Sequence, residues 1–211
     1  MNIIFGVKPM HKISAFLFGA VLLLGATTVL QAQDVPAITT SDEEDMSNRY
    51  VVTVTQGNTE LGKIEIKLWP DVAPLHCAFV AERVKDGYYD GTAFHRVIPG
   101  FMIQGGDPNS KDQPRETWGS GGYPEKVVAE FSDHKHVRGT LSAARTSDPN
   151  SFGGQFFLCV ADSPWLDNQY TAFGEVVSGM EVADAVVNSP RDSRDNPIEK
   201  IEMTIKPMKA E

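Results

Sequence analysis

Apolar and polar residues alternate in short runs along most of the chain after residue 48, and this pattern constrains the fold more than any other feature. Residues 50–54 and 64–68 alternate in this way and flank a turn at Gln56, Gly57 and Asn58, which predicts a β-hairpin. Helical features occur only at residues 71–85 and 180–188, each stopped by a Gly or Pro shortly afterwards. Six further strands are expected at residues 93–98, 101–105, 139–143, 155–160, 172–177 and 198–206.

Eight short strands with two separated helices argue against repeated strand–helix–strand units and favour an antiparallel sheet that closes on itself. The sequence therefore predicts an all-β-dominated fold. Side chains fill the interior of an eight-stranded barrel, so a ligand groove must lie on its outside. The 211 residues, 41% of them hydrophobic, suffice for one buried core, which predicts one domain with an N-terminal tail. Residues 107–131 are polar and rich in Gly, which predicts a long surface loop.

The stretch from Phe94 to Asp107 combines an arginine, two large apolar side chains and an amide on closely spaced strands: Arg96, Phe101, Met102 and Gln104. This set suits a surface that grips an apolar peptide segment and directs hydrogen bonds at its backbone. About fifty residues further on, residues 153–158 and 165–167 supply a second aromatic wall, and residues 139–145 lie between the two stretches.

As an ordered set, these stretches closely resemble cyclophilin-type peptidyl-prolyl cis/trans isomerases, and the resemblance runs from about Arg49 to Pro207. It implies a closed eight-stranded antiparallel β-barrel with a helix capping each end. It also implies catalysis of the rotation about X–Pro bonds, without a cofactor or a metal, in proline-containing peptides and unfolded proteins. The alternative is a non-catalytic module that binds proline peptides as a chaperone or scaffold.

Two residues fall on the family's catalytic positions. Arg96 matches the catalytic arginine, whereas an arbitrary arginine would more often form a surface ion pair. Gln104 matches the amide that binds the substrate backbone and helps to hold the arginine. His95 is expected to have a structural role rather than a catalytic one, because the reaction transfers no obligatory proton.

The resemblance also assigns a set of substrate-binding residues. Four of them match the proline pocket, although each taken singly is more often a core residue. Tyr170 stands where many members have histidine, and Phe152, Gly153 and Gly154 replace small polar residues beside a neighbouring pocket that selects residues before proline. The substrate-binding residues are Phe101, Met102, Phe157 and Leu166 in the proline pocket, with Ala144, Trp165 and Tyr170 around it. Trp165 also predicts binding of cyclosporin, as in family members with tryptophan at this position.

The N-terminal region has the pattern of a secretory signal peptide over residues 1–32, with Lys8 and Lys12 before an apolar run at residues 13–30. The alternative is an uncleaved membrane anchor, because 18 residues approach the length that crosses a bilayer. Residues 33–48 are acidic and short of large apolar residues, which predicts a flexible linker before an isomerase domain at residues 49–208. We therefore expect export, to the periplasm or an equivalent space.

The net charge of −9 makes a nucleic-acid partner unlikely, because phosphate binding requires a basic patch. Cys77 and Cys159 permit one disulfide in an oxidising compartment, but the resemblance places them on a helix and on a barrel strand, which disfavours pairing. The histidines show no ligand spacing with the cysteines, so no metal site is expected. A monomer that acts on exported proteins is the expected form.

Overall fold

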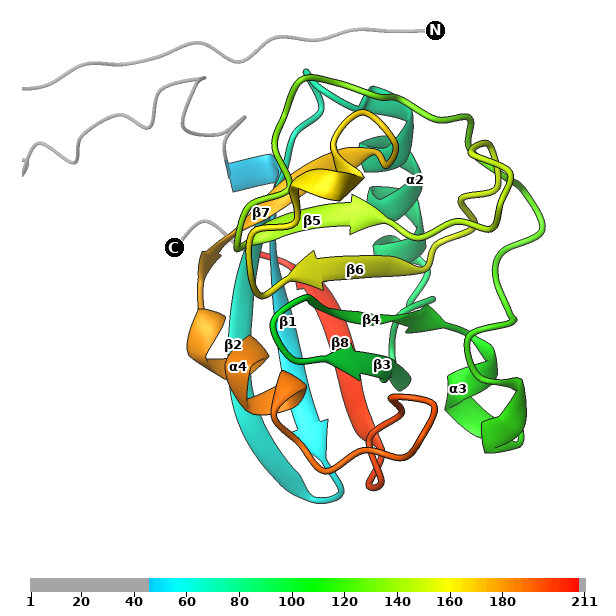
Figure 1. The fold of residues 1–211 in the computed structure, drawn as a ribbon, viewed down its shortest axis with the longest axis vertical. Helices are drawn as coiled ribbons and strands as arrows, with labels where there is room; N and C mark the ends of the chain where they lie inside the picture. Colours follow the sequence, from blue (N-terminus) through cyan, green and yellow to red (C-terminus); the bar gives the residue numbers. More distant parts are fainter. Residues whose placement is uncertain (1–45, 209–211) are drawn as a thin grey trace, which may run out of the picture. The chain divides into compact units, whose positions relative to one another are not determined.

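The computed structural model describes residues 46–208, and in this part of the chain eight strands close into an antiparallel barrel in the order β1-β2-β7-β5-β6-β4-β3-β8 (Figure 1). The predicted barrel is therefore confirmed. The predicted signal peptide at residues 1–32 and most of the predicted linker at residues 33–48 lie outside the described residues. The strands are β1 (Arg49–Gln56), β2 (Thr59–Leu68), β3 (Thr92–Ile98), β4 (Met102–Asp107), β5 (Thr140–Ala143), β6 (Phe156–Cys159), β7 (Ala172–Ser178) and β8 (Ile201–Pro207).

The strands β3, β4, β6 and β5 lie side by side (Figure 1). Successive apolar residues along these strands belong alternately to two different apolar clusters. Ile103 pairs with Val97 on one side and with Leu158 on the other, and all three belong to the main core inside the barrel. The neighbours Met102 and Phe157 belong to a second, separate apolar cluster. Because successive strand residues point to opposite faces, this second cluster lies on the outside of the barrel.

Two longer helices pack on the barrel and lie well apart in Figure 1: α2 (Pro74–Lys85) and α4 (Met180–Val187). Pro74 begins α2, where its missing N–H costs no hydrogen bond, and the apolar side of the helix buries residues such as Val80 and Val84. Gly179 precedes α4 in the left-handed conformation, with φ of 87°. Both helices occur where the sequence predicts them. No helix within residues 46–208 is long and apolar enough to span a membrane.

Asp107 organises the start of the long loop after β4. The carboxylate is fully buried and accepts hydrogen bonds from the backbone N–H groups of Asn109, Gly119 and Gly121. The loop is not entirely irregular, since it contains α3 (Asn109–Asp112) and the 3-10 helix η1 (Arg115–Thr117), which the sequence did not predict. Asp107 therefore holds residues 119–121 against the end of β4.

Cys77 and Cys159 are both buried free thiols, without a disulfide. They belong to different apolar clusters, Cys77 to the barrel core and Cys159 to the external one. Burial raises the pKa of each thiol to about 12. Both cysteines therefore act as small apolar residues.

Candidate active site

The external apolar cluster brings together the residues expected to form the proline pocket. Met102 on β4, Phe157 on β6 and Leu166 on the 3-10 helix η2 (Pro164–Leu166) are buried against one another. They form an apolar surface on the outside of a barrel whose interior is already filled. Around this centre lie the partly buried side chains of Ile98, Phe101, Ala144 and Tyr170.

Trp165 forms one wall of this cluster. Its ring packs against Phe101 with the ring centroids 5.6 Å apart, yet 56% of the residue remains exposed. A large aromatic side chain that is supported on one face and open on the other can contact a ligand without first being ordered. The geometry thus places Trp165 beside the pocket predicted from the sequence.

Tyr170 closes another side of the cluster. Its ring meets Phe157 edge to face at 5.7 Å, and the Arg145 guanidinium lies 4.3 Å from the ring centroid. Arg145 is fixed there by three hydrogen bonds, two to the Gln169 carbonyl and one to that of Thr146. At Tyr170 this chain therefore presents an aromatic ring beneath a cation.

Arg96 lies at the edge of the cluster on β3. Its side chain is exposed, and the strand register sets it opposite Gln104 on β4, next to an irregularity between Phe94 and Arg96. Arg96 and Gln104 line a shallow depression of about 390 Å³. No ion pair joins Arg96 to a carboxylate among residues 46–208, so the alternative of a surface ion pair is not observed in this part of the chain.

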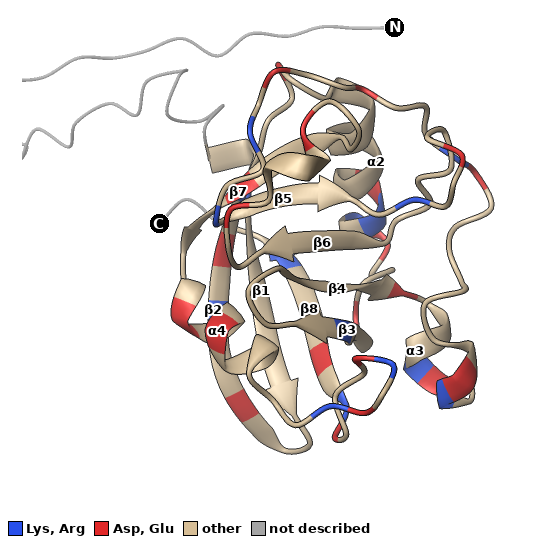
Figure 2. Ribbon diagram, viewed as in Figure 1, with Lys and Arg blue, Asp and Glu red and all other residues tan. Residues whose placement is uncertain are grey.

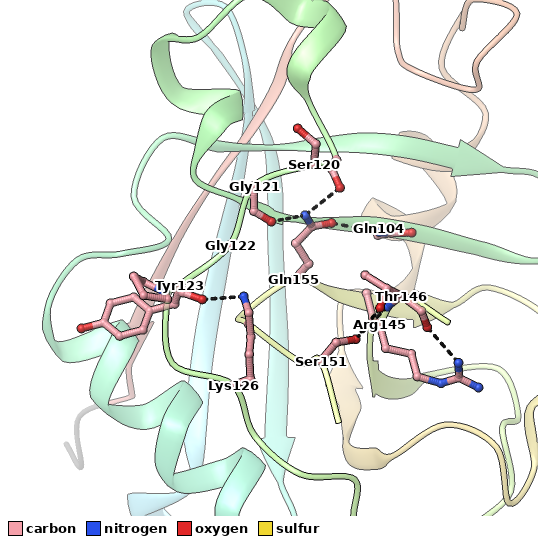
Figure 3. Close-up of a pocket in the computed structure, with 14 residues that line it drawn as sticks. Gln104, Ser120, Gly121, Gly122, Tyr123, Lys126, Arg145, Thr146, Ser151 and Gln155 are labelled. Carbon is pink, nitrogen blue, oxygen red and sulfur yellow. Dashed lines mark hydrogen bonds between the residues drawn. The ribbon is translucent and has the colours of Figure 1, made fainter. Parts of the chain in front are cut away.

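Gln104 is held by a second glutamine. Its amide nitrogen donates to the Gln155 side-chain oxygen at 3.0 Å, and Gln155 in turn donates to the carbonyls of Gly119 and Gly121 at 3.0 and 2.8 Å (Figure 3). The described residues show no hydrogen bond between the side chains of Gln104 and Arg96. Gln155 is not among the site residues predicted from the sequence, although it directly precedes Phe156 and Phe157.

His95 is buried beside Arg96, and neither ring nitrogen has a hydrogen-bond partner among the described residues. Burial lowers the pKa of this imidazole, because a charge would be poorly solvated there. A neutral, buried ring agrees with the packing role expected from the sequence.

A chain of polar groups, buried at His136 and Ser142 and partly buried at Asp167, runs behind Phe157. His136 Nδ1 lies 3.2 Å from an Asp167 carboxylate oxygen, and His136 Nε2 lies 3.0 Å from the Ser142 hydroxyl. This Asp–His–Ser order resembles a hydrolase triad, but Ser142 is fully buried and its hydroxyl donates to the Thr171 carbonyl. The imidazole stacks on Phe157 with centroids 6.2 Å apart, so the chain supports the pocket wall.

A second pocket, of about 610 Å³, adjoins the cluster and shares Gln104 and Ala144 with the surface just described (Figure 3). Gly153 lines this pocket, whereas the Phe152 side chain is buried in the barrel core. The Phe-Gly-Gly segment can therefore shape the pocket through the missing side chain of Gly153. The ring of Phe152 takes no direct part.

Comparisons with known proteins agree with this geometry. The family model described as cyclophilin type peptidyl-prolyl cis-trans isomerase/CLD matches residues 50–207. A probable peptidyl-prolyl cis-trans isomerase of Brucella suis is 39% identical over 167 residues, which cover 76% of this chain and 82% of that protein. A peptidyl-prolyl cis-trans isomerase of Schizosaccharomyces pombe is 41% identical over 146 residues, which cover 69% of this chain and 92% of that protein.

Among solved structures, a cyclophilin type peptidyl-prolyl cis-trans isomerase of Cryptosporidium parvum, determined in the presence of the dipeptide Ala-Pro, matches with a TM-score of 0.69. The two chains are 29% identical, and the match covers 77% of this chain and 99% of that one. The family match, these relatives and the closed barrel show that the chain belongs to the cyclophilin family of peptidyl-prolyl cis-trans isomerases.

Proposed function

We propose that this protein is exported and accelerates the isomerisation of X–Pro bonds in other exported proteins, with Arg96 as the group that favours the twisted bond. The uncatalysed rotation crosses a barrier of roughly 20 kcal/mol and takes tens of seconds, because amide resonance must be lost. No covalent bond is made or broken. A catalyst therefore needs only to bind the twisted state more tightly than the planar ones.

The twisted bond differs from the planar one at the prolyl nitrogen, which loses conjugation and becomes a better hydrogen-bond acceptor. Arg96 supplies several N–H donors, and the absence of a carboxylate partner among the described residues leaves them available. This availability, beside an apolar cluster that fits a proline ring, is the observation that carries the proposal. A donor aimed at a group that forms only in the transition state raises kcat.

The remaining site residues would hold the substrate. The prolyl ring would enter the cluster between Met102, Phe157 and Leu166, with Phe101 and Trp165 along its open side. Gln104 would bind the peptide backbone through its side-chain oxygen, since its amide nitrogen is already bonded to Gln155. Ala144 and Tyr170 would line the approach.

Export is supported by the basic residues followed by the apolar run at residues 13–30. In that reading residues 1–32 are removed, residues 33–48 form an acidic linker, and residues 49–208 act on clients as a monomer in the periplasm or an equivalent space. An uncleaved apolar segment would instead tether the same domain to the membrane.

The proposed role of Arg96 is tested by comparing Arg96→Ala with wild type in an isomerisation assay that resolves kcat from KM. The expected loss in kcat/KM is at least about tenfold, equivalent to about 1.4 kcal/mol of transition-state stabilisation, with most of it in kcat. Arg194→Ala serves as the matched control, because Arg194 lines the same depression but lies 3.9 Å from Asp192. Near-normal kcat in a folded Arg96→Ala protein would remove Arg96 from the mechanism.

A further inference from the structure

The pocket beside Gln104 has a positively charged lining, whereas the chain as a whole is negatively charged. Two cationic residues, Lys126 and Arg145, line it, and none of its lining residues is acidic. The chain as a whole carries a net charge of −9, and acidic residues occur on strands, helices and loops of the described part of the chain (Figure 2). A cationic pocket on an acidic protein attracts a negative group locally although the molecule repels it at a distance.

Neither cation is neutralised within the described residues. Arg145 donates to the carbonyl oxygens of Gln169 and Thr146, and Lys126 donates to the Tyr123 carbonyl at 2.6 Å (Figure 3). Carbonyl oxygens orient the two side chains but leave their full positive charge in place. A negative group near Gly153 would therefore find the Lys126 ammonium already positioned, which reduces the entropy lost on binding, whereas the Arg145 guanidinium lies on the other side of the view in Figure 3 and adds to the positive field from there.

Two glycines border the position of the Lys126 ammonium. A Cβ atom at Gly153 would collide with the Lys126 ammonium, and a Cβ atom at Gly122 would lie 3.3 Å from it. A side chain at Gly153, in the Phe152-Gly153-Gly154 segment that departs from the family pattern, would displace this ammonium group from its place at the pocket wall. The glycine at position 153 and the placement of the Lys126 ammonium in the pocket lining are therefore linked.

We infer that this pocket takes an acidic side chain of the client, so that the protein prefers prolines that have Asp or Glu at one nearby position. This inference rests on the proposed function, because the pocket shares Gln104 with the surface proposed to bind the peptide backbone. A peptide whose proline occupies the external cluster would extend past Gln104 and Ala144 into this pocket. Lys126 then determines which side chain is accepted there, and Arg145 adds to the positive charge of the lining.

The test uses a set of peptides that share one X–Pro pair. Each peptide carries a single Glu, Gln or Lys at one of the three positions before or the three positions after that pair. For the wild type, we expect kcat/KM to be about threefold to tenfold higher for Glu than for Gln at one of these positions, and lowest for Lys. High salt should bring the Glu value close to the Gln value.

Variants of Lys126 then identify the source of the preference. Lys126→Gln should reduce the ratio of Glu to Gln turnover, and Lys126→Glu should favour the Lys peptide. Lys63→Gln is the matched control, because Lys63 is exposed on β2, which is not hydrogen-bonded to the strands of the site, and its loss changes the net charge equally. A ratio near one at every position in the wild type, or a ratio unchanged in both Lys126 variants, would overturn the inference.

Peptide affinity, measured by fluorescence anisotropy on the same set, keeps this outcome separate from the proposed function. Loss of turnover on every peptide with a retained preference in binding would contradict the proposed function and support the acidic pocket. Normal turnover with equal affinity for the Glu and Gln peptides would support the proposed function and contradict the acidic pocket.

Discussion

Gln155 accepts a 3.0 Å hydrogen bond from Gln104, while its own amide nitrogen is bonded to the carbonyls of Gly119 and Gly121. One buried side chain thus joins the strand that carries Gln104 to the loop that Asp107 anchors. Both walls of the cationic pocket meet at this side chain, since Gln104, Gly119 and Gly121 all line it.

Gln155→Leu should therefore impair activity and stability together. The variant loses three hydrogen bonds, but the glycine carbonyls can be hydrated, so we expect a loss of about 1–2 kcal/mol in the free energy of unfolding. We also expect a fall of about threefold to tenfold in kcat/KM, because Gln104 is no longer held in place. Chemical denaturation and the isomerisation assay measure the two effects. Unchanged kcat/KM at reduced stability would show that Gln155 acts on the fold alone.

Three buried histidines should make the fold sensitive to mild acid. Burial lowers the pKa of His76, His95 and His136, so the folded state favours their neutral forms. An unfolded histidine titrates near about 6.5, so below that pH the unfolded chain binds more protons than the folded one. The free energy of unfolding should therefore be constant above about pH 7 and decrease as the pH falls towards 5. Urea denaturation at a series of pH values measures this dependence.

His95 offers a specific control for this pH dependence. Its ring nitrogens have no partner among the described residues, so His95→Leu forfeits no hydrogen bond and should change stability at pH 7.5 by less than about 1.5 kcal/mol. The same variant should weaken the dependence between pH 7 and 5. A slope identical to that of wild type would mean that His95 does not contribute to it.

Both cysteines should be unreactive in the folded protein. Their thiols are buried and their pKa values are raised to about 12, so almost no thiolate is present at pH 8. A thiol reagent should label neither cysteine in native protein and both after denaturation. Rapid labelling of native protein would contradict this burial, and absence of labelling after denaturation would indicate a disulfide.

Much of the fold was predictable because alternation is a local property. It identified all eight strands, but two of their starts were misplaced: β2 was expected from residue 64 and begins at Thr59, and β8 was expected from residue 198 and begins at Ile201. Ile198 fits the apolar pattern, yet it is 61% exposed and its N–H bonds to the Pro190 carbonyl. This hydrogen bond, with the Arg191–Pro197 bridge beside it, closes a turn over residues 190–198 that keeps Ile198 out of the strand. The alternation of apolar and polar residues does not reveal that turn.

The site was predictable only where a motif identified it. The resemblance grouped Phe101, Met102, Phe157 and Leu166, and the structure brings them into one cluster. Gln155 and the pair His136–Asp167 were missed, because their partners come from other segments that meet only when the barrel closes. The cations of the second pocket were missed for the same reason.

The signal peptide remains a prediction that concerns residues outside the described part of the chain. Protein recovered from the exported compartment should lack residues 1–32, because a basic segment followed by an apolar run is removed after export. Mass spectrometry of the intact protein reports the new N-terminus. Full-length chain in the membrane fraction would instead favour the anchor.

Trp165 should report on ligand binding, and cyclosporin is the ligand with which to test it. The indole is 56% exposed and supported by Phe101, so an apolar ligand in the groove would bury it and change its fluorescence. Cyclosporin should also inhibit turnover, and Trp165→Phe should weaken both effects because the smaller ring loses contact area and an N–H donor. Trp118→Phe is the necessary control, since Trp118 lines the depression that contains Arg96. A fluorescence change that persists in Trp165→Phe but disappears in Trp118→Phe would place the ligand at that depression and away from the Phe101–Trp165 wall.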